Sequence, residues 1–287
     1  MTELSVRETN PHNHTPRLVS EKRGLTLLEL IVVLAILAAV AAIVVPLLPN
    51  LLRRAHKSVD ATQSSELAKS IQMYHALYNG YPDNFDALVD SAGVFPNYIP
   101  NDDAPGTPFG GFVTATALTE AEQKALGRVG ITRVQLFSTT LGSGQHPTMN
   151  PYAGAITGTA INDGNAQSTQ LFCTLNKTAI ATANPSFLQA EFASDPTARY
   201  VVFGVGPRCT MVNKVIQDAP TSVPQNAGLT PDRFYCRVGA IFKVSGTEVS
   251  RTDRARFIGC VAMEDDELET TEKDIVGYYE VVNDANP

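Results

Sequence analysis

The feature that most constrains this chain is an apolar stretch near its N-terminus, from Leu25 to Val45, which contains one charged residue, Glu29. Its 21 residues form roughly 31 Å of helix, which is long enough to cross the hydrocarbon core of a bilayer. A signal peptide has a shorter apolar core followed by small residues, whereas Pro46 follows here. We therefore expect a transmembrane helix rather than a signal peptide or a buried core helix.

Glu29 is the unusual residue of this stretch. A carboxylate in an apolar span costs about 2.5–3.5 kcal/mol on insertion scales, so it is a functional-site candidate. A cationic partner must come from a lipid headgroup, another subunit or a new N-terminus. Cleavage after Gly24 creates an α-amino group four residues before Glu29, and this amine, on the same or a neighbouring chain, could neutralise the carboxylate. The pattern suggests a processed, self-associating helix.

The residues around this cleavage point form a recognisable motif. Lys22-Arg23-Gly24, followed by Leu25-Thr26-Leu27-Leu28-Glu29, resembles the class III signal of type IV pilins and type II secretion pseudopilins. The resemblance implies that a prepilin peptidase cleaves after Gly24 and N-methylates Leu25, which stands where the family usually has Phe. It also places the N-terminus in the cytoplasm and the later residues outside the bacterial inner membrane. Charge alone leaves this orientation open, because basic residues flank both ends of the span.

Pro46 is the second notable residue of the N-terminal region. A proline inside a helix removes one hydrogen bond and clashes with the carbonyl four residues earlier, here Ala42, so it kinks or locally melts the helix. Pilin-like proteins commonly carry a proline at this offset. The resemblance therefore gives Pro46, together with Glu29, a role in assembly, while the simpler interpretation is that Pro46 ends the membrane span.

After Pro49 the apolar residues again recur three and four positions apart, which predicts that the helix resumes. Asn79-Gly80 ends it, with Gly80 as the C-terminal cap. The segment that follows, around Tyr81-Pro82, resembles the one after the long helix in major pseudopilins. It predicts a short helix from about Phe85 to Ala92, capped by Asn84 and Gly93.

The remaining residues predict an α+β domain with an antiparallel sheet packed on the helix. Thr119 with Glu122 forms a capping box for a short helix that ends at Gly127. Strands are expected at 131–138, 199–204, 234–244, 256–263 and 275–282, and short connections favour a meander. The predicted organisation is a cleaved leader at 1–24, a transmembrane and spine helix at 25–80, and a globular domain at 81–287 with a loop-rich insertion around 140–230.

Four cysteines follow the apolar stretch, and an exported domain permits disulfides between them. Three pairings are open. We prefer Cys236–Cys260, which joins adjacent predicted strands, together with Cys173–Cys209, which staples the loop-rich region. Buried thiols are the alternative, and no C-x-x-C spacing supports a zinc or redox site.

No catalytic constellation is evident, so we predict that the chain is not an enzyme. Gly204-Val205-Gly206 lacks the third glycine of a dinucleotide fingerprint. Major pseudopilins often bind calcium, which makes weak calcium candidates of five acidic residues: Asp102, Asp103, Glu264, Asp265 and Asp266. Neither acidic run has EF-hand spacing, so solvated turns and no cofactor are the expectation.

Charge also bears on the partners. The chain has a net charge of −7, and the residues after Lys57 contain 15 Lys/Arg and 25 Asp/Glu, which disfavours nucleic acid as the main partner. The resemblance instead implies a prepilin peptidase, other pilin or pseudopilin subunits and an inner-membrane assembly platform. The expected function is that of a structural subunit of a type II secretion pseudopilus or a type IV pilus. The alternative is a non-polymerising, single-span envelope protein with a binding or enzymatic ectodomain.

Overall fold

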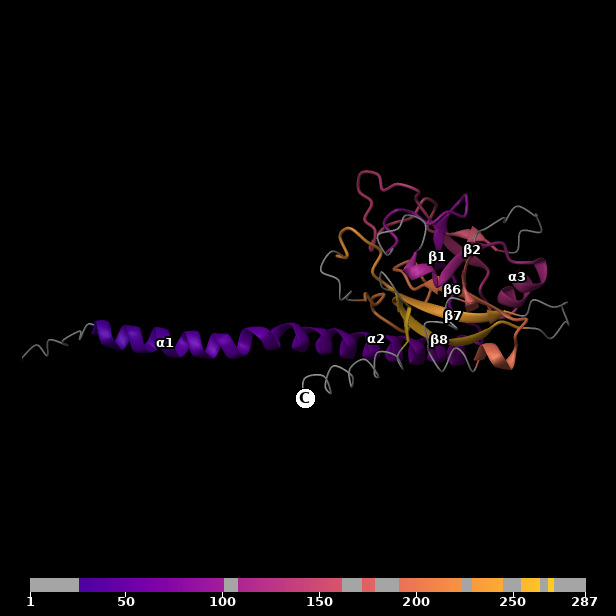
Figure 1. Cartoon of the computed structure of the whole chain (residues 1–287). Coiled ribbons are helices and arrows are strands. Elements are labelled where there is room, and N and C mark those ends of the chain that lie inside the picture. The colour runs from indigo at the N-terminus through magenta and orange to yellow at the C-terminus, as the bar shows by residue number, and fades with distance from the viewer. Residues whose placement is uncertain are drawn as a thin grey trace, which may run out of the picture. The chain divides into compact units, whose positions relative to one another are not determined.

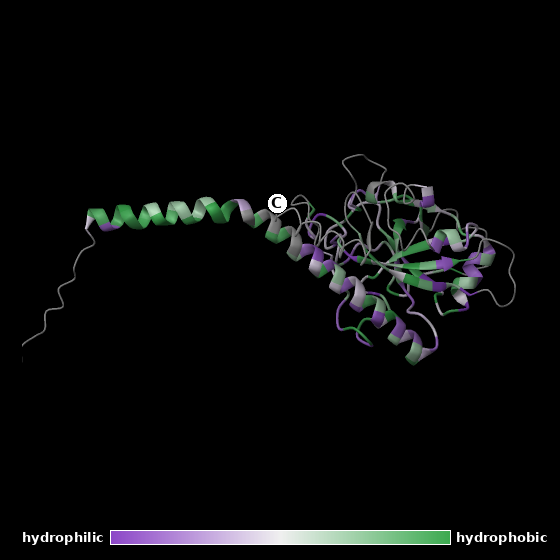
Figure 2. Cartoon of the chain, turned by 60° about the horizontal axis from the view of Figure 1, so that its bottom comes forward, coloured by the Kyte–Doolittle hydropathy of each residue, from purple (hydrophilic) through white to green (hydrophobic). Residues whose placement is uncertain are grey.

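The computed structural model describes residues 26–100, 108–161, 172–178, 191–222, 229–244, 254–263 and 268–270. The chain divides into two units, residues 1–48 and 49–287. The first unit contains helix α1 (Leu27–Val44) and the short 3-10 helix η1 (Val45–Leu47). None of the residues of α1 is buried, and beyond its first turn the helix is coloured mainly as hydrophobic in Figure 2.

Helix α2 (Leu48–Tyr78) lies almost wholly in the second unit. Leu67, Ile71 and Tyr74 recur four and three positions apart and are buried, so one face of α2 packs on the rest of this unit. The second half of the predicted spine therefore belongs with the globular domain. The left-handed residue after the helix is Asn79, with φ of 54°, rather than the predicted cap Gly80.

Nine strands among the described residues form one mixed sheet. They are β1 (Phe85–Asp90), β2 (Val113–Thr116), β3 (Arg133–Phe137), β4 (Thr159–Ala160), β5 (Phe172–Leu175), β6 (Arg199–Gly204), β7 (Val238–Val244), β8 (Arg256–Met263) and β9 (Leu268–Thr270). The order is β4-β3-β1-β6-β7-β8-β9, and β5 pairs with both β2 and β6. The fold is thus α+β, as predicted.

The expectation of an antiparallel sheet is correct for β6 to β9 and wrong for one pair. Strands β6, β7, β8 and β9 form an antiparallel meander, whereas β1 and β3 run parallel. Two parallel strands need a long crossover, and the chain between them includes the 3-10 helix η2 (Phe109–Gly111), strand β2 and helix α3 (Glu120–Gly127).

The predicted helix at 85–92 is wrong, because these residues begin with strand β1. All six residues of β1 are buried, and the strand lies between β3 and β6. Phe85 and Val89 face one core cluster and Leu88 faces the other. A strand buried on both faces loses the alternating pattern that identifies strands in a sequence. A register irregularity within it accompanies the positive φ of 66° at Leu88.

The core has two parts, one on each face of the sheet. The first contains the buried residues of α2 together with Phe85, Phe203 and Phe242, and Figure 1 shows α2 running along this side of the sheet. The second lies on the opposite face, where loop residues such as Tyr98 and Tyr235 pack on strands. The sheet therefore has a helix on one face and mainly loops on the other.

Most other predicted elements are confirmed within the described residues. Helix α3 has the capping box of Thr119 and Glu122, and β3, β6 and β8 lie where strands were expected. Strand β7 begins at Val238 rather than at Phe234, since the N–H of Tyr235 donates instead to the carbonyl of Tyr98, at 2.8 Å. The strand predicted at 275–282 lies outside the described residues.

Candidate functional site

The start of α1 is built around Thr26 and Glu29. The backbone N–H of Thr26 donates to Oε2 of Glu29 at 2.8 Å, and the Thr26 hydroxyl donates to the same oxygen at 3.0 Å. In return, the N–H of Glu29 donates to Oγ1 of Thr26 at 3.3 Å. This reciprocal pattern is a capping box, which satisfies two N–H groups that a helix N-terminus otherwise leaves unpaired.

The capping box changes the interpretation of Glu29. The sequence predicts a cation from elsewhere as the partner of Glu29, whereas in the structure its carboxylate accepts hydrogen bonds from two donors of Thr26. A carboxylate in the first turn of a helix is also favoured by the helix dipole. The signal was present in the sequence, because Thr26-x-x-Glu29 is the same spacing that predicts the cap of α3 at Thr119 and Glu122.

The end of α1 is marked by Pro46, as expected. Residues Val45–Leu47 form the 3-10 helix η1, in which the N–H of Leu48 donates to the carbonyl of Val45. A proline has no N–H to continue the α-helical ladder, so a tighter turn replaces one α-helical turn at this point. Whether Pro46 also acts in assembly stays a prediction.

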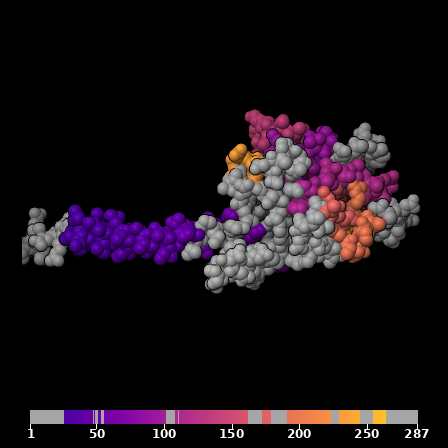
Figure 3. All heavy atoms as spheres, viewed as in Figure 1, coloured from indigo at the N-terminus to yellow at the C-terminus, as the bar shows by residue number. Residues whose placement is uncertain are grey.

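The surface of α1 is apolar along its length. Among the helices that the structure describes, α1 is the one long and apolar enough to cross a membrane, by length and composition. Its side chains are exposed throughout, and Figure 3 draws the atoms of α1 in indigo. The candidate site therefore consists of an apolar helix about 27 Å long with a carboxylate in its first turn.

Comparison with known proteins identifies this site. Residues 20–45 match the family described as the prokaryotic N-terminal methylation motif. The chain carries the class III signal of type IV pilins and pseudopilins. This prepilin-type signal runs from just before the expected cleavage point to the end of α1 and includes Glu29, whereas Gly24 and Leu25 lie outside the described residues. No curated protein and no solved structure matches the chain significantly.

The cysteines lie far from the prepilin-type signal and do not form the preferred disulfides. Cys173, Cys209 and Cys260 are unpaired, buried thiols, so neither predicted pair exists. Cys173 and Cys209 belong to core clusters on opposite faces of the sheet. Cys260 lies opposite Ala240 in the β7–β8 register, which is four residues beyond Cys236. Burial raises the pKa values of the three unpaired thiols well above their usual range.

The calcium candidates receive no support from the structure. Asp102, Asp103, Glu264, Asp265 and Asp266 all lie outside the described residues. Within the described ranges, no group of three His, Cys, Asp or Glu residues is placed to hold a metal ion. The expectation of solvated turns, with calcium binding as the weaker alternative, therefore stays a prediction.

The globular domain also contains a buried acidic residue that the sequence did not predict. Asp86 in β1 is fully buried, and the hydroxyl of Tyr235 donates to its Oδ2 at 2.6 Å. Gly204 and Gly206 make room for the cluster, because a Cβ on Gly204 would lie 2.1 Å from the Tyr235 hydroxyl and one on Gly206 would lie 2.1 Å from Asp86 Oδ2. The rejected nucleotide motif is thus a pair of packing glycines.

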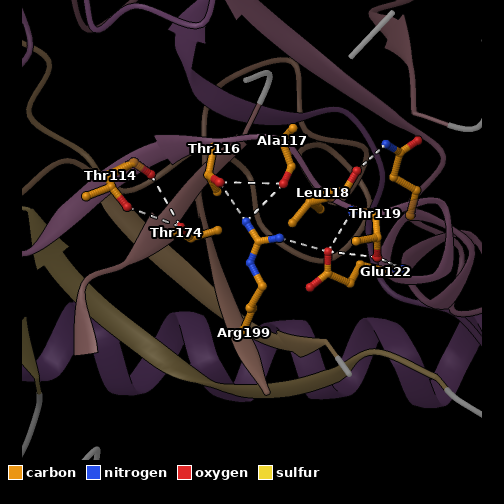
Figure 4. Close-up of polar contacts among 9 residues, drawn as sticks. Thr114, Thr116, Ala117, Leu118, Thr119, Glu122, Thr174 and Arg199 are labelled. Atoms are coloured by element: carbon orange, nitrogen blue, oxygen red, sulfur yellow. Dashed lines mark hydrogen bonds and ion pairs between the residues drawn. The ribbon is translucent and has the colours of Figure 1, made fainter. Parts of the chain in front are cut away.

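A second polar cluster joins α3 to the sheet (Figure 4). Nη1 of Arg199 in β6 lies 3.0 Å from Oε2 of Glu122, the buried residue that also caps α3. Nη2 of Arg199 donates to the hydroxyl of Thr116 at 2.7 Å and to the carbonyl of Ala117 at 3.0 Å. One guanidinium therefore holds β2, the loop after it and α3 against the first residue of β6, which is a structural role.

Proposed function

We propose that this chain is a prepilin whose mature form is a structural subunit of a type IV pilus or a type II secretion pseudopilus. A prepilin peptidase cleaves it after Gly24 on the cytoplasmic side of the inner membrane and N-methylates Leu25. Exposed α1 then packs on the helices of other subunits at an assembly platform. The observation that carries this proposal is the prepilin-type signal over residues 20–45, which coincides with an exposed apolar helix.

Glu29 has two tasks in this proposal. Its Oε2 caps α1 through Thr26, and the remaining negative charge pairs with the N-terminal amine of a neighbouring subunit and sets the register of packing. Both tasks are compatible, because the cap leaves the carboxylate charged. In a low-dielectric helix bundle, a carboxylate paired with an amine is favoured over an unpaired one.

The choice between pilus and pseudopilus stays open in this proposal. The resemblance of the segment around Tyr81-Pro82 to major pseudopilins implied a helix at 85–92, and β1 stands there instead. That segment therefore does not favour a pseudopilus. A second candidate function, a single-span envelope protein that never polymerises, shares the membrane helix and differs in having no use for the charge of Glu29.

Replacing Glu29 tests the proposal against this second candidate. In cells that produce Glu29→Leu, we expect normal membrane insertion and loss of sheared filaments or of secretion. The matched control is Val33→Leu, which changes a side chain of the same helix without a charge and should assemble normally. Unchanged assembly of Glu29→Leu would contradict the register role, and absence of any filament from the unmodified chain would favour the envelope protein.

A further inference from the structure

Arg237 is a buried cation whose hydrogen-bond acceptors are neutral. The residue is 2% exposed. Its Nε and Nη2 donate to the carbonyl of Thr148, at 3.0 and 2.9 Å, and its Nη1 donates to the carbonyl of Ala219. No carboxylate of the described residues lies within ion-pair distance of it. A buried charge is costly unless it is paired or well hydrogen-bonded, so this guanidinium gains from any stronger acceptor.

The weakest acceptor of Arg237 is the thioether sulfur of Met149. Nη2 donates to Sδ of Met149 at 3.5 Å, and a thioether sulfur accepts hydrogen bonds only weakly. In contrast to the guanidinium, Met149 is 59% exposed. This side chain therefore joins the buried cation to solvent, and small reagents in solution can reach it.

The backbone around Met149 is already held in place. Thr148 is 1% exposed, and its hydroxyl lies 2.8 Å from the carbonyl oxygen of Pro231. The N–H of Met149 itself donates to Nδ1 of His146, at 3.3 Å. A loop with a fixed backbone therefore presents the sulfur to Arg237, and a chemical change at the sulfur needs no rearrangement of the chain.

We propose that Met149 is an oxidation site, whose sulfoxide oxygen accepts the N–H of Arg237 that the thioether sulfur accepts in the reduced chain. Methionine is flexible and unbranched, so the exposed side chain can withdraw towards solvent and place one oxygen between the sulfur and Nη2. Hydrogen bonds from a charged donor to an oxygen are stronger than neutral ones. Oxidation thus replaces a weak acceptor of the buried cation with a strong one.

The oxidant in this proposal is a hydroperoxide, of which hydrogen peroxide is the simplest. A lone pair of Sδ attacks one peroxide oxygen, so an S–O bond forms while the O–O bond breaks. The proton of the attacked oxygen moves to the leaving oxygen, which departs as water when the oxidant is hydrogen peroxide. The sulfur is oxidised to the sulfoxide and the peroxide is reduced, and methionine sulfoxide reductases reverse the step.

The direction of the effect separates this site from ordinary methionine damage. A sulfoxide usually disrupts the surroundings of a methionine, because it makes an apolar side chain polar. Met149 is exposed and its sulfur contacts a guanidinium, so the new oxygen is not buried without a donor. Oxidation should therefore tighten the attachment of this loop to Arg237 and stabilise the folded domain.

The other methionines of the described residues serve as internal controls. Met211 and Met263 are fully buried, so they should stay reduced while the chain is folded. Met73 in α2 is 49% exposed, close to the value for Met149, and within the described residues its sulfur accepts no hydrogen bond. Oxidation of Met73 therefore shows what exposure alone does, without a buried cation beside the sulfur.

Thermal unfolding of the purified full chain in detergent micelles, before and after treatment with hydrogen peroxide, tests this proposal. Met73→Leu leaves Met149 as the exposed methionine of the described residues, and peptide mass spectrometry verifies its sulfoxide. We expect the unfolding midpoint of this variant to rise on oxidation by about 2–4 °C, the effect of one hydrogen bond in a domain of this length. The matched control carries Met149→Leu instead, and its oxidation at Met73 should not raise the midpoint.

A substitution gives a second test without any oxidant. Glutamine is close to methionine in shape and ends in an oxygen acceptor, so Met149→Gln should unfold about 2–4 °C above Met149→Leu. The proposal is overturned if Met149 stays a thioether while Met73 is oxidised, or if its sulfoxide leaves the midpoint unchanged or lowers it. Equal midpoints of Met149→Gln and Met149→Leu overturn it as well. Because both tests use the purified chain, their outcome is independent of processing and assembly.

Discussion

Oε2 of Glu29 accepts hydrogen bonds from both the backbone N–H and the hydroxyl of Thr26, at 2.8 and 3.0 Å. The acidic residue that made the apolar stretch unusual is therefore part of the helix start. Its charge and its hydrogen-bonding capacity are separate properties, and substitutions can remove one and keep the other.

Glu29→Gln keeps the cap and removes the charge, since glutamine also serves at the third position of a capping box. We expect this variant to insert and to be processed normally, yet to yield at least about tenfold fewer filaments, as one lost ion pair of 1.4 kcal/mol would produce. Thr26→Ala keeps the charge and weakens the cap by about 1 kcal/mol. It should therefore yield more filaments than Glu29→Gln. The measurement is the yield of filaments sheared from cells that produce each variant. Normal assembly of Glu29→Gln would show that Glu29 acts only as a helix cap.

Gly204 and Gly206 are expected not to tolerate a side chain. An added Cβ would meet the Tyr235 hydroxyl or Asp86 Oδ2 at 2.1 Å, and these atoms are buried. Gly204→Ala and Gly206→Ala should each destabilise the domain by roughly 1–3 kcal/mol. The control Gly154→Ala places a Cβ in open space and should have little effect. Thermal unfolding of the full chain in detergent measures this, and equal stabilities of all three variants would refute the packing role.

The loss of stability on breaking the ion pair of Arg199 and Glu122 should depend on which partner is replaced. Arg199→Met leaves a fully buried carboxylate uncompensated, so we expect a loss of roughly 3–5 kcal/mol. Glu122→Gln keeps the capping-box geometry and leaves the half-exposed guanidinium in partial contact with water, so its loss should be smaller. Glu120→Gln, in the exposed pair with Lys124 on the same helix, should cost under about 1 kcal/mol. The reverse order of the first two variants would contradict the role of this buried ion pair.

The buried thiols predict a specific pattern of reactivity. Because Cys173, Cys209 and Cys260 are buried and their pKa values are raised by burial, an alkylating reagent at neutral pH should leave them unmodified in the folded chain. Unfolding without reductant should make all three reactive. Intact-mass spectra before and after unfolding give the number of alkylated thiols. If the non-reduced chain stays unreactive when unfolded, the cysteines form disulfides after all.

Local signals in the sequence predicted well those elements that local interactions determine. The capping box of Thr119 and Glu122 predicted the start of α3, and the apolar run after Glu29 predicted α1. The equivalent box at Thr26 could have been found by the same rule. The apolar surroundings of Glu29 conceal this box, because a charge in a membrane span predicts a cationic partner, whereas the first turn of a helix lets its own N-cap residue supply the donors.

Non-local contacts explain what the sequence did not predict. Strand β1 has helix-like local signals, yet it pairs with β3 and with β6, whose residues are about 50 and about 120 positions away. The Asp86 cluster combines residues of three distant segments, which one sequence cannot place together. Gly204 and Gly206 were a usable signal, because glycines at the end of a strand and two positions after it indicate close packing.

Mass spectrometry of the N-terminus of the chain purified from membranes tests whether the chain is processed as a prepilin. We expect a mature chain that begins with N-methylated Leu25. We also expect a strain without prepilin peptidase to retain residues 1–24. An intact N-terminus at Met1 in the presence of the peptidase would contradict this processing.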